Sequence, residues 1–245
     1  MSQNHKITLM YNGSKFSGWQ IQKNAKTVQE EVEKAFSVIL RQPVEMVGVS
    51  RTDAGVHAKN YVAHSFFDTD IENERILLGV NAILPEGIRI KSIENCDKDF
   101  HSRYSAKSKT YIYQIDVSKH GDVFKKPYVW QYKYPLDYDE MEKCPEYFLG
   151  KHDFSAFMSK GGQAKTFERT IFDCTLTKEN DIITLKIRGD GFLYNMVRII
   201  AGTILSVGKG CFKASDIPDI ILSKERKKAG ITAPPAGLML YDIEY

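Results

Sequence analysis

The pattern of hydrophobic residues along the chain predicts a succession of strands and helices. Runs in which every second residue is apolar are typical of strands with one buried face. Such runs occur at 5–11, 44–49, 61–67, 88–94, 107–117, 128–133, 172–177, 182–188 and 238–245. Apolar residues spaced three and four apart instead indicate a helix with one buried side. That spacing occurs at 28–40, 76–84, 138–149, 192–204 and 215–223.

Residues that start or stop helices sharpen these boundaries. Thr27 and Glu30 form a capping box, in which the threonine hydroxyl bonds the amide three residues on and the glutamate reaches back. Pro43 ends the first helix. Gly150 can cap the helix predicted at 138–149, whereas Pro145 inside that pattern is expected to shorten or kink it.

The order of these elements predicts an α+β fold in two halves. The first half, 1–104, and the second half, 105–245, each combine strands and helices in the manner of a ferredoxin-like or RRM-like unit. We expect the halves to share one continuous, mostly antiparallel sheet with helices on one face. No low-complexity stretch or clear linker separates them.

Composition places the chain among globular proteins without naming a partner. It has 245 residues, of which 42% are hydrophobic and 27% charged, and its net charge is +3. That charge is too small to argue for a nucleic acid by itself. Basic residues do cluster at 107–109, 125–126 and 224–228, which fits either a solvated face or contacts to an RNA backbone.

Cysteine usage and hydropathy exclude other classes. The four cysteines form no CxxC pair and no Cys/His spacing of a zinc site, so we expect neither a metal nor a disulfide framework. The first residues lack the apolar core of a signal peptide, and no apolar run is long enough to cross a bilayer. We therefore expect a cytoplasmic protein with no membrane partner.

A polar stretch at 49–58, VSRTDAGVHA, lies between two predicted strands. It places Arg51 and Asp53 two residues apart, on a turn that Gly55 can bend through a positive φ. One interpretation is an exposed ion pair in a turn, which contributes little stability. The other is a functional carboxylate with a cation beside it.

Two further residues stand out against their surroundings. Tyr111 lies in the middle of a strongly alternating strand. Arg198 interrupts the apolar run of the helix predicted at 192–204, where burial is costly unless an anion meets the guanidinium. The alternative is that its aliphatic stem lets the charge reach solvent.

Together these motifs resemble the tRNA pseudouridine synthase A (TruA) family. The similarity follows the chain in order through YNGSKFSGWQ at 11–20, RTDAGVHA at 51–58, DFHSRYSA at 99–106, HDFSAF at 152–157, GFLYNMVR at 191–198 and TAPPAGL at 232–238. One such block alone is weak, but six in order leave little room for chance. Ser50 and Pro145 depart from the family pattern, and neither removes a catalytic group.

The resemblance implies a catalytic set and a reaction. Asp53 matches the nucleophile of the family, Arg198 the cation that keeps it ionised, and Tyr111 the residue that stacks on uracil and helps move the proton from C5. Arg51 is expected to fill the stack left by the flipped base, and Lys109 to bind RNA together with Tyr111 and Arg198. The reaction requires no metal and no organic cofactor.

The same resemblance implies the substrate and the assembly. The expected substrate is tRNA, with uridines at positions 38 to 40 of the anticodon stem-loop converted to pseudouridine in a cleft between the halves. A homodimer is expected. His57 is expected to be a hydrogen-bonded turn residue rather than an acid or base.

Two alternatives remain open from the sequence. One keeps the chemistry and changes the position or the RNA, a choice on which Ser50 could bear. The other is a non-catalytic RNA-binding module built on an RRM-like sheet, suggested by the aromatic residues of the 107–117 strand and their basic neighbours. A carboxylate at position 53 argues against a pure RNA binder.

Overall fold

The computed structural model describes residues 2–162 and 164–245, and the chain divides into two compact units. Unit 1 contains the residues up to Lys107 together with Leu240–Tyr245, and unit 2 is Ser108–Met239. The last residues of the chain therefore fold with the first unit. The halves 1–104 and 105–245 remain a prediction as independent domains.

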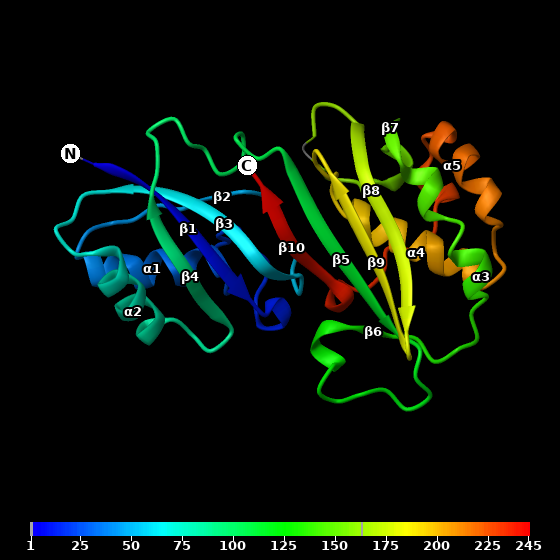
Figure 1. Cartoon of the computed structure of the whole chain (residues 1–245), viewed down its shortest axis with the longest axis horizontal. Helices are drawn as coiled ribbons and strands as arrows, with labels where there is room; N and C mark the ends of the chain where they lie inside the picture. The colour runs from blue at the N-terminus through cyan, green and yellow to red at the C-terminus, as the bar shows by residue number, and fades with distance from the viewer. Residues whose placement is uncertain (1, 163) are drawn as a thin grey trace. The chain divides into compact units, whose positions relative to one another are not determined.

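Unit 1 is a mostly antiparallel sheet with two helices (Figure 1). In chain order its elements are β1 (Gln3–Tyr11), α1 (Val28–Leu40), β2 (Val47–Gly48), β3 (His57–Phe67), α2 (Asn73–Ile83), β4 (Ile88–Asn95) and most of β10 (Leu238–Glu244). The strands lie in the order β4-β1-β3-β10, and β2 pairs with β3. Helix α2 packs against both β4 and α1.

Unit 2 is built in a similar way around mostly antiparallel strands. Its elements are β5 (Ser108–Asp116), β6 (Trp130–Gln131), α3 (Tyr138–Met141), β7 (Gly150–Asp153), β8 (Glu168–Glu179), β9 (Ile182–Gly189), α4 (Met196–Gly208) and α5 (Ile217–Ser223). The strands run in the order β5-β9-β8-β7, all antiparallel, whereas the short β6 pairs with β5 in parallel.

The fold class predicted from the sequence is confirmed. The described residues form an α+β structure with a large, mixed, mostly antiparallel sheet and five α-helices. None of those helices has the length and the apolar run needed to cross a membrane.

Helix α1 begins and ends where its sequence predicts. The Thr27 side chain accepts a hydrogen bond from the Glu30 amide at 3.4 Å, which satisfies one of the donors left open at a helix start. Arg41 ends the helix in the left-handed conformation at φ 55°. Between them the apolar stripe is buried, including Val32 and Phe36 at 0% exposure.

The prediction of a single helix at 138–149 is wrong. The segment forms the one-turn α3, then a 3-10 turn at Pro145–Phe148, then the unpredicted strand β7. Pro145 explains the break, because proline lacks the amide proton of a helix interior and its ring clashes with the preceding turn. Gly150, at φ 90°, opens β7 instead of capping a helix.

Other boundaries also move. The strands predicted at 44–49 and 128–133 shrink to the two-residue β2 and β6. The strand predicted from 61 already begins at His57, inside the polar stretch. Helix α4 starts at Met196 rather than 192, because Asn195 takes the left-handed conformation at φ 62°. Of the α4 side chains only Arg198 is not buried, so the helix is apolar on nearly every side.

Candidate functional site

The polar stretch at 49–58 is held by the segment 13–19, which lies far from it in sequence. The Gly13 amide donates to Nδ1 of His57 at 3.1 Å. The Trp19 amide donates to the Thr52 carbonyl at 3.2 Å, and the Gly55 amide donates to the Phe16 carbonyl, also at 3.2 Å. These bonds on both sides of Asp53 determine where its backbone lies.

Two glycines make this close approach possible. A Cβ at Gly13 would lie 2.0 Å from the carbonyl oxygen of Val56. A Cβ at Gly18, whose φ is +87°, would lie 2.4 Å from the carbonyl oxygen of Thr52. The motifs at 11–20 and 51–58 are therefore one structural unit, in which backbone packs on backbone.

Asp53 lies at the turn of this unit and its side chain is half-buried. Its carbonyl accepts the Val56 amide at 3.1 Å, and Gly55 adopts φ +80°, which confirms the predicted positive φ. Next to it, the Thr52 hydroxyl hydrogen-bonds the buried Tyr11 hydroxyl at 2.8 Å. Arg51 is exposed. The turn thus presents a carboxylate from a fixed backbone.

The start of the stretch is fixed by aromatic residues. Tyr61 on β3 donates its hydroxyl proton to the Ser50 carbonyl at 2.5 Å. Trp19 stacks on Tyr61 with ring centroids 4.2 Å apart, and Gly48 leaves the space that both rings occupy. The Ser50 hydroxyl itself is buried and has no hydrogen-bond partner among the described residues.

His57 is hydrogen-bonded, as predicted, but it lies at the start of β3 instead of in a turn. It is 1% exposed, begins β3, and accepts the Gly13 amide through Nδ1. An Nδ1 that accepts a backbone amide keeps the proton of the neutral ring on Nε2.

Unit 2 carries the other candidates. Tyr111 lies within β5, opposite Ile187 of β9, and its ring is 7% exposed. The Phe192 ring lies nearly perpendicular to it, at a centroid distance of 5.1 Å and an angle of 81° between the ring planes. Lys109, two residues earlier on the same strand, pairs with Gly189 and is half-buried. Tyr111 is therefore held by packing against Phe192.

Arg198 is fixed by two neutral oxygens within unit 2. Its Nε donates to the Ala233 carbonyl at 2.7 Å, and its Nη1 donates to Oδ1 of Asn195 at 2.8 Å. The Arg198 carbonyl in turn accepts the Ala233 amide at 3.1 Å. Two bonds to one guanidinium set the orientation of its plane, because the donors form a rigid fork.

Asn195 is a residue that the sequence analysis missed. Its left-handed backbone ends the preceding loop, and its side chain bridges Arg198 to the Ser159 hydroxyl, which accepts from Nδ2 at 2.9 Å. The Ser159 amide donates to the Tyr194 carbonyl at 3.1 Å. An asparagine just before an apolar helix was the available signal, since asparagine tolerates positive φ.

The segment that carries Ala233 is itself anchored. Tyr113, two residues from Tyr111 on β5, donates its hydroxyl proton to the Pro234 carbonyl at 2.8 Å. Burial raises the pKa of Tyr113, and the nearby positive charge of Arg198 only partly opposes that shift. Tyr113 therefore remains a donor and holds the Pro234 segment against the sheet.

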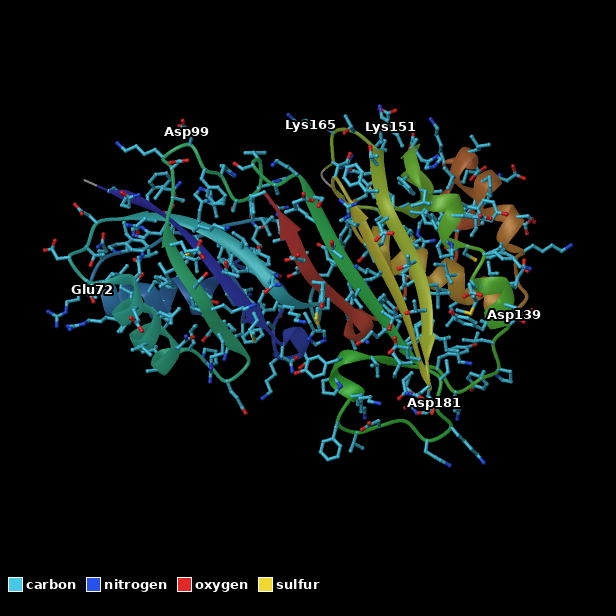
Figure 2. The ribbon with its side chains drawn as sticks, in the orientation of Figure 1. Glu72, Asp99, Asp139, Lys151, Lys165 and Asp181 are labelled. Atoms are coloured by element: carbon cyan, nitrogen blue, oxygen red, sulfur yellow. The ribbon has the colours of Figure 1, made fainter. Side chains whose placement is uncertain are left out.

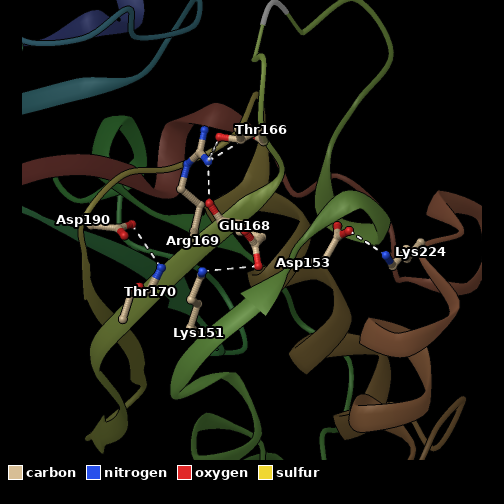
Figure 3. Close-up of polar contacts among 8 residues, drawn as sticks. All are labelled: Lys151, Asp153, Thr166, Glu168, Arg169, Thr170, Asp190 and Lys224. Carbon is tan, nitrogen blue, oxygen red and sulfur yellow. Dashed lines mark hydrogen bonds and ion pairs between the residues drawn. The ribbon is translucent and has the colours of Figure 1, made fainter.

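The basic run at 224–228 is largely engaged within unit 2. Lys224 pairs with Asp153 at 2.9 Å, and Lys227 and Lys228 both pair with Glu225 at 3.1 Å (Figure 3 shows the first of these pairs). Burial raises the pKa of Asp153, but hydrogen bonds from the Ser155 side chain and Lys224 outweigh it and hold that pKa below its usual value.

Arg226 is likewise occupied, because its guanidinium donates to the Gly230 carbonyl at 2.8 Å and to the Thr232 hydroxyl at 3.0 Å. These hydrogen bonds, with the ion pairs of the lysines, leave fewer donors of the run for an RNA backbone. In residues 2–162 and 164–245, no three His, Cys, Asp or Glu side chains form a group that could hold a metal ion.

Comparison with known proteins gives a consistent result. A sequence model of the family described as tRNA pseudouridine synthase matches residues 7–105 and 145–245. "tRNA pseudouridine synthase A" of Acetivibrio thermocellus is 45% identical over 243 residues, covering 99% of this chain and 100% of the relative. The protein of the same name from Caldicellulosiruptor saccharolyticus is 48% identical over 239 residues, covering 98% of each chain. "tRNA pseudouridine synthase A 2" of Clostridium perfringens is 43% identical over 243 residues, covering 99% of this chain and 100% of the relative.

Proposed function

Because the chain belongs to the tRNA pseudouridine synthase family, we propose that it converts uridine to pseudouridine at positions 38 to 40 of the tRNA anticodon stem-loop. Members of this family are isomerases that act on tRNA. The observation that carries the proposal is the Asp53 turn, whose backbone is held on both sides by the segment 13–19. A loop fixed in this way presents its carboxylate in one position, as catalysis requires.

The reaction is an isomerisation in which no atom is lost. The bond between N1 of uracil and C1′ of the ribose breaks, the base rotates, and a bond from C5 to C1′ forms. C5 gives up a proton and N1 gains one. Asp53 acts as the nucleophile, forming a covalent intermediate that divides the exchange into two easier steps.

Arg198 and Tyr111 are proposed to assist Asp53 on the same uridine. A cation near a carboxylate favours its ionised, nucleophilic form, and the bonds from Asn195 and Ala233 support this role by orienting the Arg198 guanidinium. Tyr111 stacks on the uracil ring and its hydroxyl helps to transfer the C5 proton. The Phe192 edge supports that role by holding the Tyr111 ring.

The remaining roles concern RNA binding. A uridine within a folded stem-loop must be flipped out of its stack before a carboxylate can reach it. Arg51 is exposed next to Asp53, and a planar guanidinium can fill the vacated place. Lys109 contacts the RNA backbone. We also propose that the protein acts as a cytoplasmic homodimer.

The nucleophile is tested with Asp53→Asn and Asp53→Ala on tRNA labelled with tritium at uracil C5. We expect tritium release to be abolished while tRNA binding is largely retained. Turnover by either variant would remove Asp53 from its role. Pseudouridine mapping of total RNA from cells with and without the protein tests the position. If cells without the protein lack pseudouridine only at positions outside 38 to 40, the result would favour the same chemistry at another site.

The family assignment favours this enzymatic function over the non-catalytic RNA-binding module that the aromatic strand also suggested. The two differ in one measurable way, because a pure binder releases no tritium from the labelled tRNA under any condition.

A further inference from the structure

A loop of unit 2 carries an apolar tip that the proposed chemistry does not use. This loop, residues 117–134, leaves β5 and returns through β6 (Figure 1). At its apex Phe124 is 89% exposed and Val123 is 77% exposed. Phe124 is the most exposed large hydrophobic side chain in the described part of the chain. We call these two residues the apolar tip.

The apex is shaped by one aspartate. Oδ1 of Asp122 accepts the Phe124 amide at 2.9 Å, and its carbonyl accepts the Lys125 and Lys126 amides at 3.2 and 2.8 Å. The Lys125 carbonyl then accepts the Tyr128 amide at 2.8 Å. The turn that presents Phe124 is therefore formed within the protein alone.

The base of the loop is braced as well. The buried Asp116 carboxylate accepts the Ser118 amide at 2.9 Å, and the Ser118 hydroxyl accepts the Gly121 amide at 3.1 Å. Gly121, at φ +73°, lies so close to the Gln131 side chain that a Cβ would come within 2.2 Å of it. A loop ordered in advance loses little entropy when it binds a partner.

Charge and ring chemistry identify the partner that fits. The 117–134 loop carries four lysines and one carboxylate, that of Asp122, whose ion pair with Lys125 at 3.7 Å is longer than the ion pairs of the 224–228 run. Behind the tip, Trp130, Tyr132 and Tyr134 follow one another edge to face, with centroid separations of 5.6 and 5.5 Å. Lysines next to exposed aromatic rings are typical of surfaces that bind nucleic acid, where rings stack on bases and lysines meet phosphates.

We propose that this loop is a second tRNA contact, in which Phe124 stacks on an unpaired loop base while Lys125 and Lys126 contact the flanking phosphates. The inference rests on the proposed action on tRNA. A second copy of the chain fits less well, because two such loops facing each other would bring eight lysines together against two carboxylates.

The base of the loop lies away from Tyr111. Tyr111 and Val117 are six residues apart along the strand direction, about 20 Å at the rise of an extended chain. The Val117 amide donates to the Asp181 carbonyl at 2.8 Å, at the turn between β8 and β9. Figure 2 shows Asp181 at the opposite end of unit 2 from Lys151 and Lys165. In this proposal Phe124 contacts a nucleotide of the tRNA other than the target uridine.

The test compares Phe124→Ala and the double variant Lys125→Gln/Lys126→Gln with the wild-type protein. Leu222→Ala, at a residue 75% exposed on α5, and Lys34→Gln, at an exposed residue on α1, are the matched controls. Each protein is measured for tRNA dissociation constant across a salt series, for kcat at saturating tRNA by tritium release, and for mass by analytical ultracentrifugation.

We expect Phe124→Ala to weaken tRNA binding about tenfold, as loss of one stacked base does, with kcat unchanged. The double lysine variant should reduce the slope of log K against log salt by about 1.5, because two phosphate contacts are lost. The controls should match the wild type. Wild-type turnover in the same assay tests the proposed function separately from the tip.

Two results would overturn the inference. Unchanged affinity and salt slope in both loop variants would show that the loop does not touch tRNA. A loop variant could instead bind tRNA more weakly, show a lower mass, and recover its affinity at high protein concentration. That result would show that the tip joins two copies of the chain.

Discussion

Substitution of Gly18 by alanine tests whether the segment 13–19 positions the Asp53 turn. A Cβ at Gly18 would lie 2.4 Å from the Thr52 carbonyl oxygen, and real Cβ atoms essentially never come closer than 3.0 Å to such an atom. Thr52 or Gly18 must therefore move by about 0.6 Å or more. Because Thr52 precedes Asp53, that displacement passes directly to the proposed nucleophile.

The size of the effect follows from two terms. The positive φ of Gly18 costs an alanine about 1–2 kcal/mol, or roughly 2–8 °C in melting temperature for a chain of this size. A displacement near 1 Å in a catalytic group costs about 100-fold in rate. We therefore expect Gly18→Ala to lower kcat by about 10- to 100-fold, with a smaller change in the tRNA dissociation constant.

Gly210→Ala is the matched control. Its φ is +73°, close to that of Gly18, but no atom lies within 4 Å of a Cβ built there. It carries the same backbone strain without the contact. Both variants are measured by thermal denaturation and by tritium release at saturating tRNA. Equal kcat values for the two variants would refute the claim that Gly18 holds the Asp53 turn in place.

Three further predictions follow from the same structure. Arg198→Ala should reduce kcat by at least 100-fold. Arg198→Lys should restore little of that activity, because an ammonium cannot bond Asn195 and Ala233 in the way that the guanidinium fork does. Rates of tritium release measure both variants. Burial and the neighbouring His101 charge lower the pKa of His64, so the unfolding free energy should fall as pH drops below about 6.5. Urea titrations should show that the unfolding free energy of His64→Gln depends less on pH. Ser50→Ala should leave the unfolding free energy unchanged or raise it by up to about 1 kcal/mol in the same titrations, because the lost hydroxyl has no partner among the described residues.

The sign of the His64 prediction comes from burial, which lowers the pKa of His64 by more than the hydrogen bond with Val47 raises it. Nδ1 of His64 accepts the Ser102 amide at 3.1 Å, which requires the neutral ring. The unfolded chain takes up a proton near pH 6.5, whereas the folded chain does so only at lower pH. Stability is therefore present above the unfolded pKa and is lost as pH falls toward the folded pKa.

Local patterns predicted the regular elements well, because those elements depend on residues close together in sequence. Helix α1 has its cap at Thr27 and a repeating apolar stripe, and both signals lie within the segment itself. The failure at 138–149 has the opposite character. Its apolar spacing continues through Pro145, and only the cost of placing a proline in a helix interior decides that the segment breaks there.

The candidate site was predictable as a set of residues but not as a set of contacts. Resemblance to a family identified Asp53, Tyr111 and Arg198, whose roles remain predictions. The bonds from Trp19 to Thr52 and from Gly55 to Phe16 that hold the Asp53 turn join backbone atoms about 30 to 40 residues apart. No composition or periodicity encodes such pairs, because backbone amides and carbonyls are present at nearly every position.

Asn195 explains why the contacts of Arg198 could not be predicted from the helical spacing alone. The apolar spacing from 192 onward suggests a helix that carries Arg198 on its second turn, where its surroundings would be apolar side chains. The left-handed Asn195 delays the helix start to Met196, so Arg198 falls within the first turn. There the Asn195 side chain, projecting from the end of the loop, can reach Nη1, and the Ala233 carbonyl can reach Nε. A single residue in an uncommon backbone conformation thus converts a costly arginine in an apolar helix into an oriented cation.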